Sequence, residues 1–312
     1  MKEIVPHYQS QFCCIADRCR HSCCIGWEID VDEDTLERYR LVTGDFGDRL
    51  RKNIAILEEG ACFCMDEDER CPFLNQKGLC DIYTELGEDA LCQICSDHPR
   101  YRNYFSDRVE MGLGLCCEAA AELILSQTEP LSLKIAWDDG EDAAAEPFEE
   151  WLRTYRDQLL AGVWNGSSCR EIANGMYDDF TASGREWIAE LRELEQLNLS
   201  WDQLLCELQR APADVWLDEM AEHDNAFRNL LAYFLYRHVS ASVCSNEVSA
   251  RVGFACLSYR IICALCAEKK RTAGECTFED LAEYARMYSL EIEYSEENTL
   301  ALLMQLEKLK ES

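Results

Sequence analysis

Thirteen of the twenty cysteines of this chain lie between residues 13 and 117, and several of them are neighbours or stand a few residues apart. Adjacent pairs occur three times, at Cys13-Cys14, Cys23-Cys24 and Cys116-Cys117. A hydrophobic core has no need of such pairs, whereas thiolates gathered from short loops are the usual ligands of structural zinc and of iron–sulfur clusters. The spacing therefore predicts metal binding in the first part of the chain.

The closest spacings are found in Cys14-x4-Cys19-x3-Cys23-Cys24 and in Cys92-x2-Cys95. Single cysteines follow turn-like residues at Cys71 and Cys80. A zinc ion and a four-iron cluster each take four protein ligands, so these candidates exceed the needs of one site. Spacing alone leaves zinc and iron–sulfur both open, and it also leaves open whether there are two centres or one centre with additional packed thiols.

The elements that must position these thiols are short. We expect a helix capped by Asp34 that ends near Leu41, a second helix over 44–57, and a third over 118–125. Apolar residues alternate over 108–115 and 131–137, which predicts two strands that pair with each other.

From residue 147 onward the periodicity is helical almost throughout. The sequence thus predicts a mainly α protein with a small β element, in which a loop-rich cysteine domain over 1–138 precedes a helical bundle over 147–312. The acidic segment 138–147 is the expected connection. In the bundle, Cys256, Cys263 and Cys266 share one helical face and are expected to pack as small apolar residues.

Composition limits the classes of partner. The 312 residues carry 60 acidic and 30 basic side chains, a formal charge of −30 that repels nucleic acid and anionic lipid and attracts basic proteins. No run approaches the roughly 20 apolar residues that cross a bilayer, so we expect no membrane insertion. The first ten residues contain no apolar run of the kind that drives secretion, which favours a reducing, cytoplasmic location for the thiols.

Longer motifs around the cysteines resemble those of the flagellin lysine-N-methylase (FliB-type) family. The matching segments are Phe12-Cys-Cys-Ile-Ala-Asp-Arg-Cys-Arg-His-Ser-Cys-Cys-Ile-Gly-Trp27, Cys71-Pro-Phe-Leu-Asn75, Cys80-Asp-Ile-Tyr-Thr-Glu-Leu-Gly87, Leu91-Cys-Gln-Ile-Cys95 and Cys116-Cys-Glu-Ala-Ala120. A later segment, 229–238, is also similar to a helical segment of that family, and the first half resembles a broader cysteine-rich zinc- or iron-chelating family.

The resemblance implies a cytoplasmic enzyme that methylates lysines of flagellin with S-adenosylmethionine and holds an iron–sulfur cluster of the 4Fe–4S type, with zinc as the alternative. Carried over by position, the metal ligands are Cys14, Cys19, Cys23, Cys24, Cys71, Cys80, Cys92, Cys95 and Cys116. Two positions depart from the family pattern. Cys117 replaces a proline, and His98 replaces the tyrosine of a Tyr-Pro-Arg motif.

Methyl transfer to lysine needs a neutral amine, and deprotonating an ordinary lysine at neutral pH costs roughly 4 to 5 kcal/mol. Aromatic walls favour this deprotonation by desolvating the ammonium. Under the resemblance, Tyr83 and Asp81 are the candidate catalytic residues beside the lysine. Trp27, Arg100 and Tyr101 are the candidates for binding the methyl donor, with Arg100 clamping its carboxylate.

A second class of function stays open at this stage. The chain could be a non-catalytic zinc or iron carrier, or a redox-sensing module, that docks another protein through its acidic surface. Such a protein needs no catalytic base, and the spacing of the residues identifies none.

Overall fold

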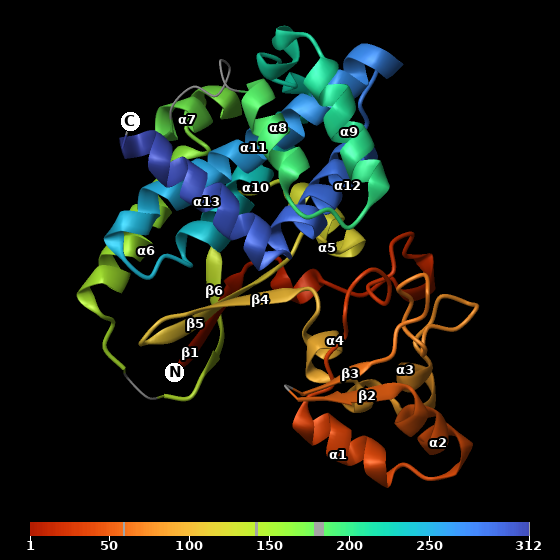
Figure 1. The fold of residues 1–312 in the computed structure, drawn as a ribbon. Coiled ribbons are helices and arrows are strands. Elements are labelled where there is room, and N and C mark those ends of the chain that lie inside the picture. The colour runs from red at the N-terminus through yellow and green to blue at the C-terminus, as the bar shows by residue number, and fades with distance from the viewer. Residues whose placement is uncertain (59, 141–142, 178–183, 312) are drawn as a thin grey trace. The chain divides into compact units, whose positions relative to one another are not determined.

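The computed structural model describes residues 1–58, 60–140, 143–177 and 184–311 (Figure 1). Two compact units make up the chain. The helical unit consists of Met1–Phe12 together with Arg102–Ser312, and the cysteine unit consists of Cys13–Tyr101. This division differs from the expected one at residues 138–147, because the first strand of the chain joins the sheet of the helical unit. Part of the expected connection, residues 141–142, lies outside the described residues.

Helices predominate in the helical unit, as the sequence predicts. The strands are β1 (Lys2–Pro6), β4 (Arg100–Tyr104, across the unit boundary), β5 (Arg108–Leu113) and β6 (Leu133–Asp138). The helices are η1 (Gln9–Gln11), α5 (Glu118–Leu125), α6 (Pro147–Gly162), α7 (Cys169–Met176), α8 (Gly184–Glu193), α9 (Leu199–Arg210), η4 (Ala213–Trp216), η5 (Ala221–His223), α10 (Asp224–Phe234), η6 (Leu235–Val239), α11 (Ser245–Ala273), α12 (Phe278–Tyr288), η7 (Ser289–Glu293) and α13 (Glu296–Glu311).

Helix α11 is the core of this unit. It contacts α7, α9, α10, α12 and α13, which surround it in Figure 1. Cys256, Cys263 and Cys266 are buried along it, which confirms that these thiols pack as apolar residues. Among the described residues α11 is long and apolar enough to span a membrane, but 94% of its apolar window is buried inside the protein, as in the core helix of a folded domain.

The sheet has the strand order β4-β5-β1-β6. Strand β1 pairs in parallel with β5, from Lys2 opposite Arg108, and antiparallel with β6, where Pro6 lies opposite Leu133. Both strands that the alternating patterns predict are present. The prediction that they pair with each other was wrong, because β1 is inserted between them and satisfies the backbone groups of both.

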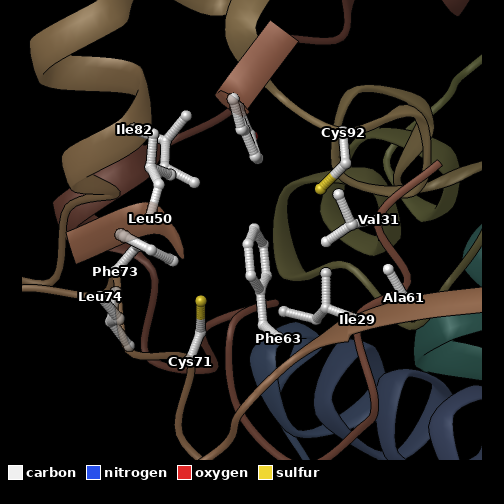
Figure 2. Packing of buried hydrophobic residues seen from close by; sticks show 11 residues of the cluster. Ile29, Val31, Leu50, Ala61, Phe63, Cys71, Phe73, Leu74, Ile82 and Cys92 are labelled. Carbon is white, nitrogen blue, oxygen red and sulfur yellow. The ribbon is translucent and has the colours of Figure 1, made fainter. Parts of the chain in front are cut away.

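The cysteine unit contains few regular elements. They are η2 (Ala16–Arg18), α1 (Glu33–Leu41), α2 (Gly44–Lys52), β2 (Ile54–Leu57), β3 (Gly60–Phe63), α3 (Asp81–Leu86), η3 (Glu88–Ala90) and α4 (Gln93–Asp97). Its core is a small aromatic and aliphatic cluster in which the rings of Phe63 and Phe73 lie 5.0 Å apart. Figure 2 shows that Cys71 and Cys92 belong to this core.

Two local predictions in the cysteine unit were wrong. The helix expected over 44–57 ends at Lys52, because Ile54–Leu57 pairs with Gly60–Phe63 as a hairpin and both segments gain ladder hydrogen bonds. The cap of α1 is Asp32 rather than Asp34, since the Asp32 carboxylate accepts the backbone N–H of Thr35 at 2.9 Å.

Candidate functional site

Six of the nine predicted metal ligands lie in one neighbourhood of the cysteine unit. They are Cys23, Cys24, Cys71, Cys80, Cys92 and Cys95, and we call them the six-thiol group. The Sγ atoms of Cys92 and Cys95 are 3.5 Å apart. Cys71 is close enough to Cys24, Cys80 and Cys92 to interact with them electrostatically, and Cys95 is similarly close to Cys23 and Cys24.

Backbone pairing of distant loops brings these thiols together. Cys71 donates its N–H to the carbonyl of Cys24 at 2.8 Å. The residue after Cys24, Ile25, forms an antiparallel bridge with the residue before Cys71, Arg70. A second bridge joins Leu74 to Cys80 across a tight turn. Cys92 precedes α4, and its carbonyl accepts the N–H of Cys95 at 3.0 Å, which places both side chains at the start of that short helix.

The donor chemistry of the six-thiol group fits a thiolate-bound metal. Two thiolates on one tetrahedral ion, each about 2.3 Å from it, lie roughly 3.8 Å apart, close to the separation of Cys92 and Cys95. Over the ranges that the structure describes, no set of three or more Cys, His, Asp or Glu side chains is closed around a point so as to hold an ion as it stands. The ligand assignments therefore stay predictions, and closure would require side-chain rotations between staggered rotamers.

The ionisation of these thiols also favours a cation as partner. The hydrogen bond with Cys23 lowers the pKa of Cys24 to about 7 against the opposing effect of burial, with help from Ser22 and Arg70. Burial raises the pKa of Cys71 to about 12. A thiol of that kind stays protonated at neutral pH unless a bound metal ion stabilises its thiolate, so metal binding would release protons.

The other three predicted ligands make different contacts. Cys14 and Cys19 sit on the loop around η2, where Cys14 Sγ accepts the N–H of Ala16 and Cys19 Sγ donates to the carbonyl of His21 at 3.0 Å. Cys116 belongs to the helical unit and is buried there, with a hydrogen bond to Tyr294.

The candidate catalytic residues come after Cys80 on α3, Asp81 as the next residue and Tyr83 two residues later. Both carboxylate oxygens of Asp81 are engaged: Asn75 donates to one at 2.8 Å and Arg49 to the other at 2.6 Å. Burial raises the pKa of Asp81, but these two partners outweigh burial and leave the pKa below its ordinary value. Asp81 thus ties α2 and the 71–75 turn to α3. Tyr83 is half exposed.

The candidate donor-binding residues precede and follow the cysteines in the chain, and one of them contacts the six-thiol group. The indole N–H of Trp27 donates to the carbonyl of Cys23 at 2.7 Å, and the Trp27 ring is 5.8 Å from the ring of His98. Arg100 donates to the carbonyl of Ser96. Tyr101 is the last residue of the cysteine unit. The structure therefore brings Trp27 to Cys23, a member of the six-thiol group.

A cavity of about 440 Å³ lies between the sheet and α6 in the helical unit. Its lining is Ile4, Arg108, Leu133, Lys134, Ile135, Glu150, Arg153, Thr154, Arg156 and Asp157. Such a volume is common for small-molecule sites. Its arginines are already paired with the carboxylates of Asp107, Glu110 and Asp157, so the cavity offers little excess positive charge to an anion.

The sequence reasoning gave no role to a buried polar network in the helical unit, formed by Tyr233, Arg237, His238 and Glu293. Residues 233–238 fall within the segment that resembles the FliB-type family, but nothing in their spacing points to Glu293, which is 55 residues from His238. One signal was available. Glu291 and Glu293 alternate with the apolar residues Leu290, Ile292 and Tyr294. Exposed carboxylates give the same alternation, so it does not distinguish a buried glutamate from an exposed one.

Comparison with known sequences decides the family. Residues 105–312 match the family described as FliB lysine N-methylase C-terminal domain. The chain belongs to this FliB family. The matched region covers nearly all of the helical unit and includes the motif at Cys116, whereas the cysteine-rich motifs up to Cys95 precede it.

Curated relatives of this FliB-family chain carry related names. It is 30% identical over 144 residues to the lysine-N-methylases of Salmonella typhimurium and Salmonella choleraesuis, and these matches cover 43% of this chain and 35% of each relative. It is also 30% identical over 143 residues to the flagellar biosynthetic protein FliU of Salmonella muenchen, of which the match covers 84%. The match thus spans about a third of the length of the two lysine-N-methylases. No solved structure matches the chain.

Proposed function

We propose that this chain is a protein lysine N-methyltransferase that uses S-adenosylmethionine as the methyl donor. The observation that carries the proposal is the family match, which extends over 105–312 and includes nearly the whole helical unit. The names of the relatives support lysine methylation as the reaction class. The name of the FliU relative supports a flagellar protein, flagellin, as the substrate.

The charge of the chain suits such a substrate. A formal charge of −30 attracts lysine-rich surfaces and increases the rate at which they encounter the enzyme. The thiols suit a reducing compartment, so we place the reaction in the cytoplasm.

The six-thiol group would hold the metal, with four of its members as ligands of a 4Fe–4S cluster or of zinc. When bound, this centre supplies folding free energy to a unit whose hydrophobic core is small, and it fixes the loops that carry Trp27 and Tyr83.

The test is methyl transfer by the full chain, purified without oxygen. It would be incubated with flagellin and isotopically labelled S-adenosylmethionine, and methylated lysines would be located by mass spectrometry. We expect label on flagellin lysines and none when a lysine-free segment of flagellin is supplied. Absence of transfer from metal-loaded protein would contradict the proposal.

The alternative function, a metal carrier or redox-sensing module, makes a different prediction. A ligand at 100 times its dissociation constant stabilises a fold by about 2.7 kcal/mol. S-Adenosylmethionine should therefore raise the melting temperature of an enzyme and leave that of a carrier unchanged.

A further inference from the structure

Strand β6 forms one edge of the sheet in the helical unit, and it is both apolar and exposed. Among the strands that the structure describes, only β1 pairs with it, so the other side of its backbone is open. Ile135 and Trp137 on this strand are 59% and 57% exposed. An edge strand of this kind is a template for pairing with another chain, and folded proteins usually protect such an edge. Strand β6 is therefore a candidate docking site for a further strand.

The register shows which backbone groups face the open side. The carbonyl of Ser132 accepts the N–H of His7, which follows β1, at 2.8 Å. Backbone groups alternate in direction along an antiparallel strand, so Leu133 and Ile135 direct their N–H and C=O groups away from β1. Pro6 agrees with this assignment, because it lies opposite Leu133 and has no N–H to donate. Two residues of β6 thus offer donors and acceptors to an added strand.

Apolar side chains lie on both faces of this edge. Ile135 is opposite Ile4, and Trp137 is opposite Glu3. Because Glu3 and Ile4 are adjacent residues of β1, they point to opposite faces of the sheet, and so do their partners. An added strand would therefore find one large apolar side chain on each face.

The cavity between the sheet and α6 lies beside this edge, and Ile135 forms part of its wall. All four basic residues of the wall are engaged by carboxylates or by other oxygen atoms of the chain, and they are Arg108, Lys134, Arg153 and Arg156. Over the described ranges, the exposed carboxylate of Glu150 in the same wall is paired with no side chain. The uncompensated charge of the cavity is therefore negative, which favours a cation.

We propose that β6 binds an extended, basic segment of the substrate protein as an additional strand of the sheet. The backbone of that segment pairs with Leu133 and Ile135, and one of its lysine or arginine side chains enters the cavity beside Glu150. The identity of the partner rests on the proposed methyltransferase function. This surface holds the substrate protein, and the lysine that is methylated is not placed in the cavity.

Charge selects this occupant over others. Each chain has a formal charge of −30, so a second copy on this edge would bring like charges together, as would an acidic peptide. The exposed Asp138 at the end of β6 adds to the local negative charge. Pairing through the main chain also reads little of the partner's side-chain sequence, which suits a substrate whose lysines lie in different sequence contexts.

The first test measures the binding of short labelled peptides to the full chain by fluorescence anisotropy. In these peptides lysine alternates with threonine, so in an extended conformation the lysine amides point to one side and the threonine amides to the other. One isomer is N-methylated at the lysine amides and the other at the threonine amides. We expect one isomer to bind like the unmethylated peptide and the other at least about tenfold more weakly, because only one set of N–H groups faces β6.

The two isomers have the same composition and charge, so each is the control for the other. Equal binding of both, or equal loss of binding, would overturn strand addition. A peptide with glutamate in place of lysine should bind far more weakly, and tight binding of that acidic peptide would overturn the choice of a basic partner.

Variants of the full chain place the site on β6. Ile135→Pro removes an outward N–H and no hydrogen bond to β1, so it should keep the fold and raise the Kd of the lysine peptide at least about tenfold. Ile135→Val keeps that N–H and is the matched control. Glu150→Gln should raise the Kd of the lysine peptide about 2- to 5-fold and leave unchanged the Kd of a peptide with norleucine in place of lysine. An unchanged Kd in Ile135→Pro would contradict the proposal.

A further pair of variants covers the case in which Ile135→Pro does not fold. Trp137→Ala should raise the Kd of the lysine peptide about fivefold, because an exposed aromatic contact is lost. Its control is Tyr104→Ala, which removes a 74% exposed aromatic side chain from β4 at the other edge of the sheet and should change the Kd little. Equal effects of the two variants would show that the peptide does not bind at β6.

Turnover and self-association separate this inference from the proposed function. With flagellin as substrate, Ile135→Pro should raise KM about tenfold and leave kcat nearly unchanged. Methyl transfer with an unchanged KM would refute only the docking site. Isomer-selective peptide binding by a chain that transfers no methyl group would support the docking site and refute the proposed function. Dimerisation of the wild-type chain that Ile135→Pro abolishes in sedimentation would assign β6 to a second copy and overturn the proposal.

Discussion

Arg156 on α6 and Glu110 on β5 form an ion pair in the interior of the helical unit, where their side chains are 1% and 0% exposed. Arg156 also donates to the hydroxyl of Ser240, the residue that follows η6, at 2.7 Å. Its guanidinium lies over the ring of Tyr236. One arginine thus connects the sheet, α6 and the turn that carries His238.

Loss of this arginine should destabilise the helical unit strongly. In Arg156→Met the Glu110 carboxylate loses its cation and stays buried, so we expect the free energy of unfolding to fall by about 3 to 5 kcal/mol in urea denaturation. The double variant Glu110→Leu/Arg156→Met should recover much of that loss. Asp202→Asn, which breaks an exposed pair with Arg192, is the control and should change little. A mild Arg156→Met effect would contradict this account.

Metal content should follow the six-thiol group. Cys92→Ser and Cys23→Ser should each lose bound metal and lower the stability of the cysteine unit, because a site that loses one of four ligands binds weakly. The exposed Cys244 of the helical unit provides the control, and Cys244→Ser should keep full occupancy. Iron, zinc and sulfide analysis of protein purified without oxygen, together with an absorption spectrum, measures the outcome. Full occupancy in both ligand variants would refute the assignment.

The cap of α1 provides a test at residue level. One oxygen of Asp32 accepts the N–H of Thr35 at 2.9 Å and the other accepts the N–H of Gln93 at 2.8 Å, so a single carboxylate joins α1 to α4. We expect Asp32→Ala to cost about 1 to 2 kcal/mol of unfolding free energy, and Asp34→Ala, two residues later, to cost far less. Equal losses would show that the cap is misassigned.

The same carboxylate predicts a pH dependence. Burial raises the pKa of Asp32, but the N–H donors Gln93 and Thr35 outweigh it, and the pKa lies below its ordinary value. At pH values between the lowered pKa and the ordinary pKa of about 3.9, the folded form therefore binds fewer protons than the unfolded form. The stabilisation is complete above about pH 3.9 and is lost as the pH falls through the lower folded pKa. Asp32→Ala should flatten this acid limb of the stability curve.

Two helical glycines should respond in opposite directions to alanine. A Cβ at Gly253 would lie 2.6 Å from the ring of Tyr177, whose hydroxyl is held by the carbonyl of Leu306. We expect Gly253→Ala to lose about 1 to 3 kcal/mol by overpacking. At Gly175 in α7 a Cβ meets nothing within 4 Å, so Gly175→Ala should gain up to about 1 kcal/mol. Differential scanning calorimetry of both variants measures the two shifts.

Local patterns predicted the helical elements well where the sequence signal was itself local. The helix over 118–125 has the expected bounds, and α6 begins at Pro147, where a proline in the first turn is favourable. Where distant partners decide the structure, local patterns failed. Residues 54–57 carry helical spacing but form a strand, because Gly60–Phe63 offers ladder hydrogen bonds that periodicity does not register.

The candidate site shows the same limit. Clustering along the chain was enough to select Cys92 and Cys95, whose Sγ atoms meet. It could not show that Cys116 lies in the other unit. That placement arises because the chain leaves the helical unit after Phe12 and re-enters it at Arg102, before Cys116. The contact between His238 and Glu293 joins two helices far apart in sequence, so it was visible only once both had been placed.

The sheet of the helical unit imposes an order of events on biosynthesis. Strand β1 is synthesised before the cysteine unit, and its partners β5 and β6 are synthesised after it. Once the ribosome has made residues 13–101, the cysteine unit has all of its own residues, whereas β1 still lacks both of its neighbours. The cysteine unit can therefore fold first. The helical unit can complete its sheet only after about a hundred further residues have been made, when β5 and β6 become available to pair with β1.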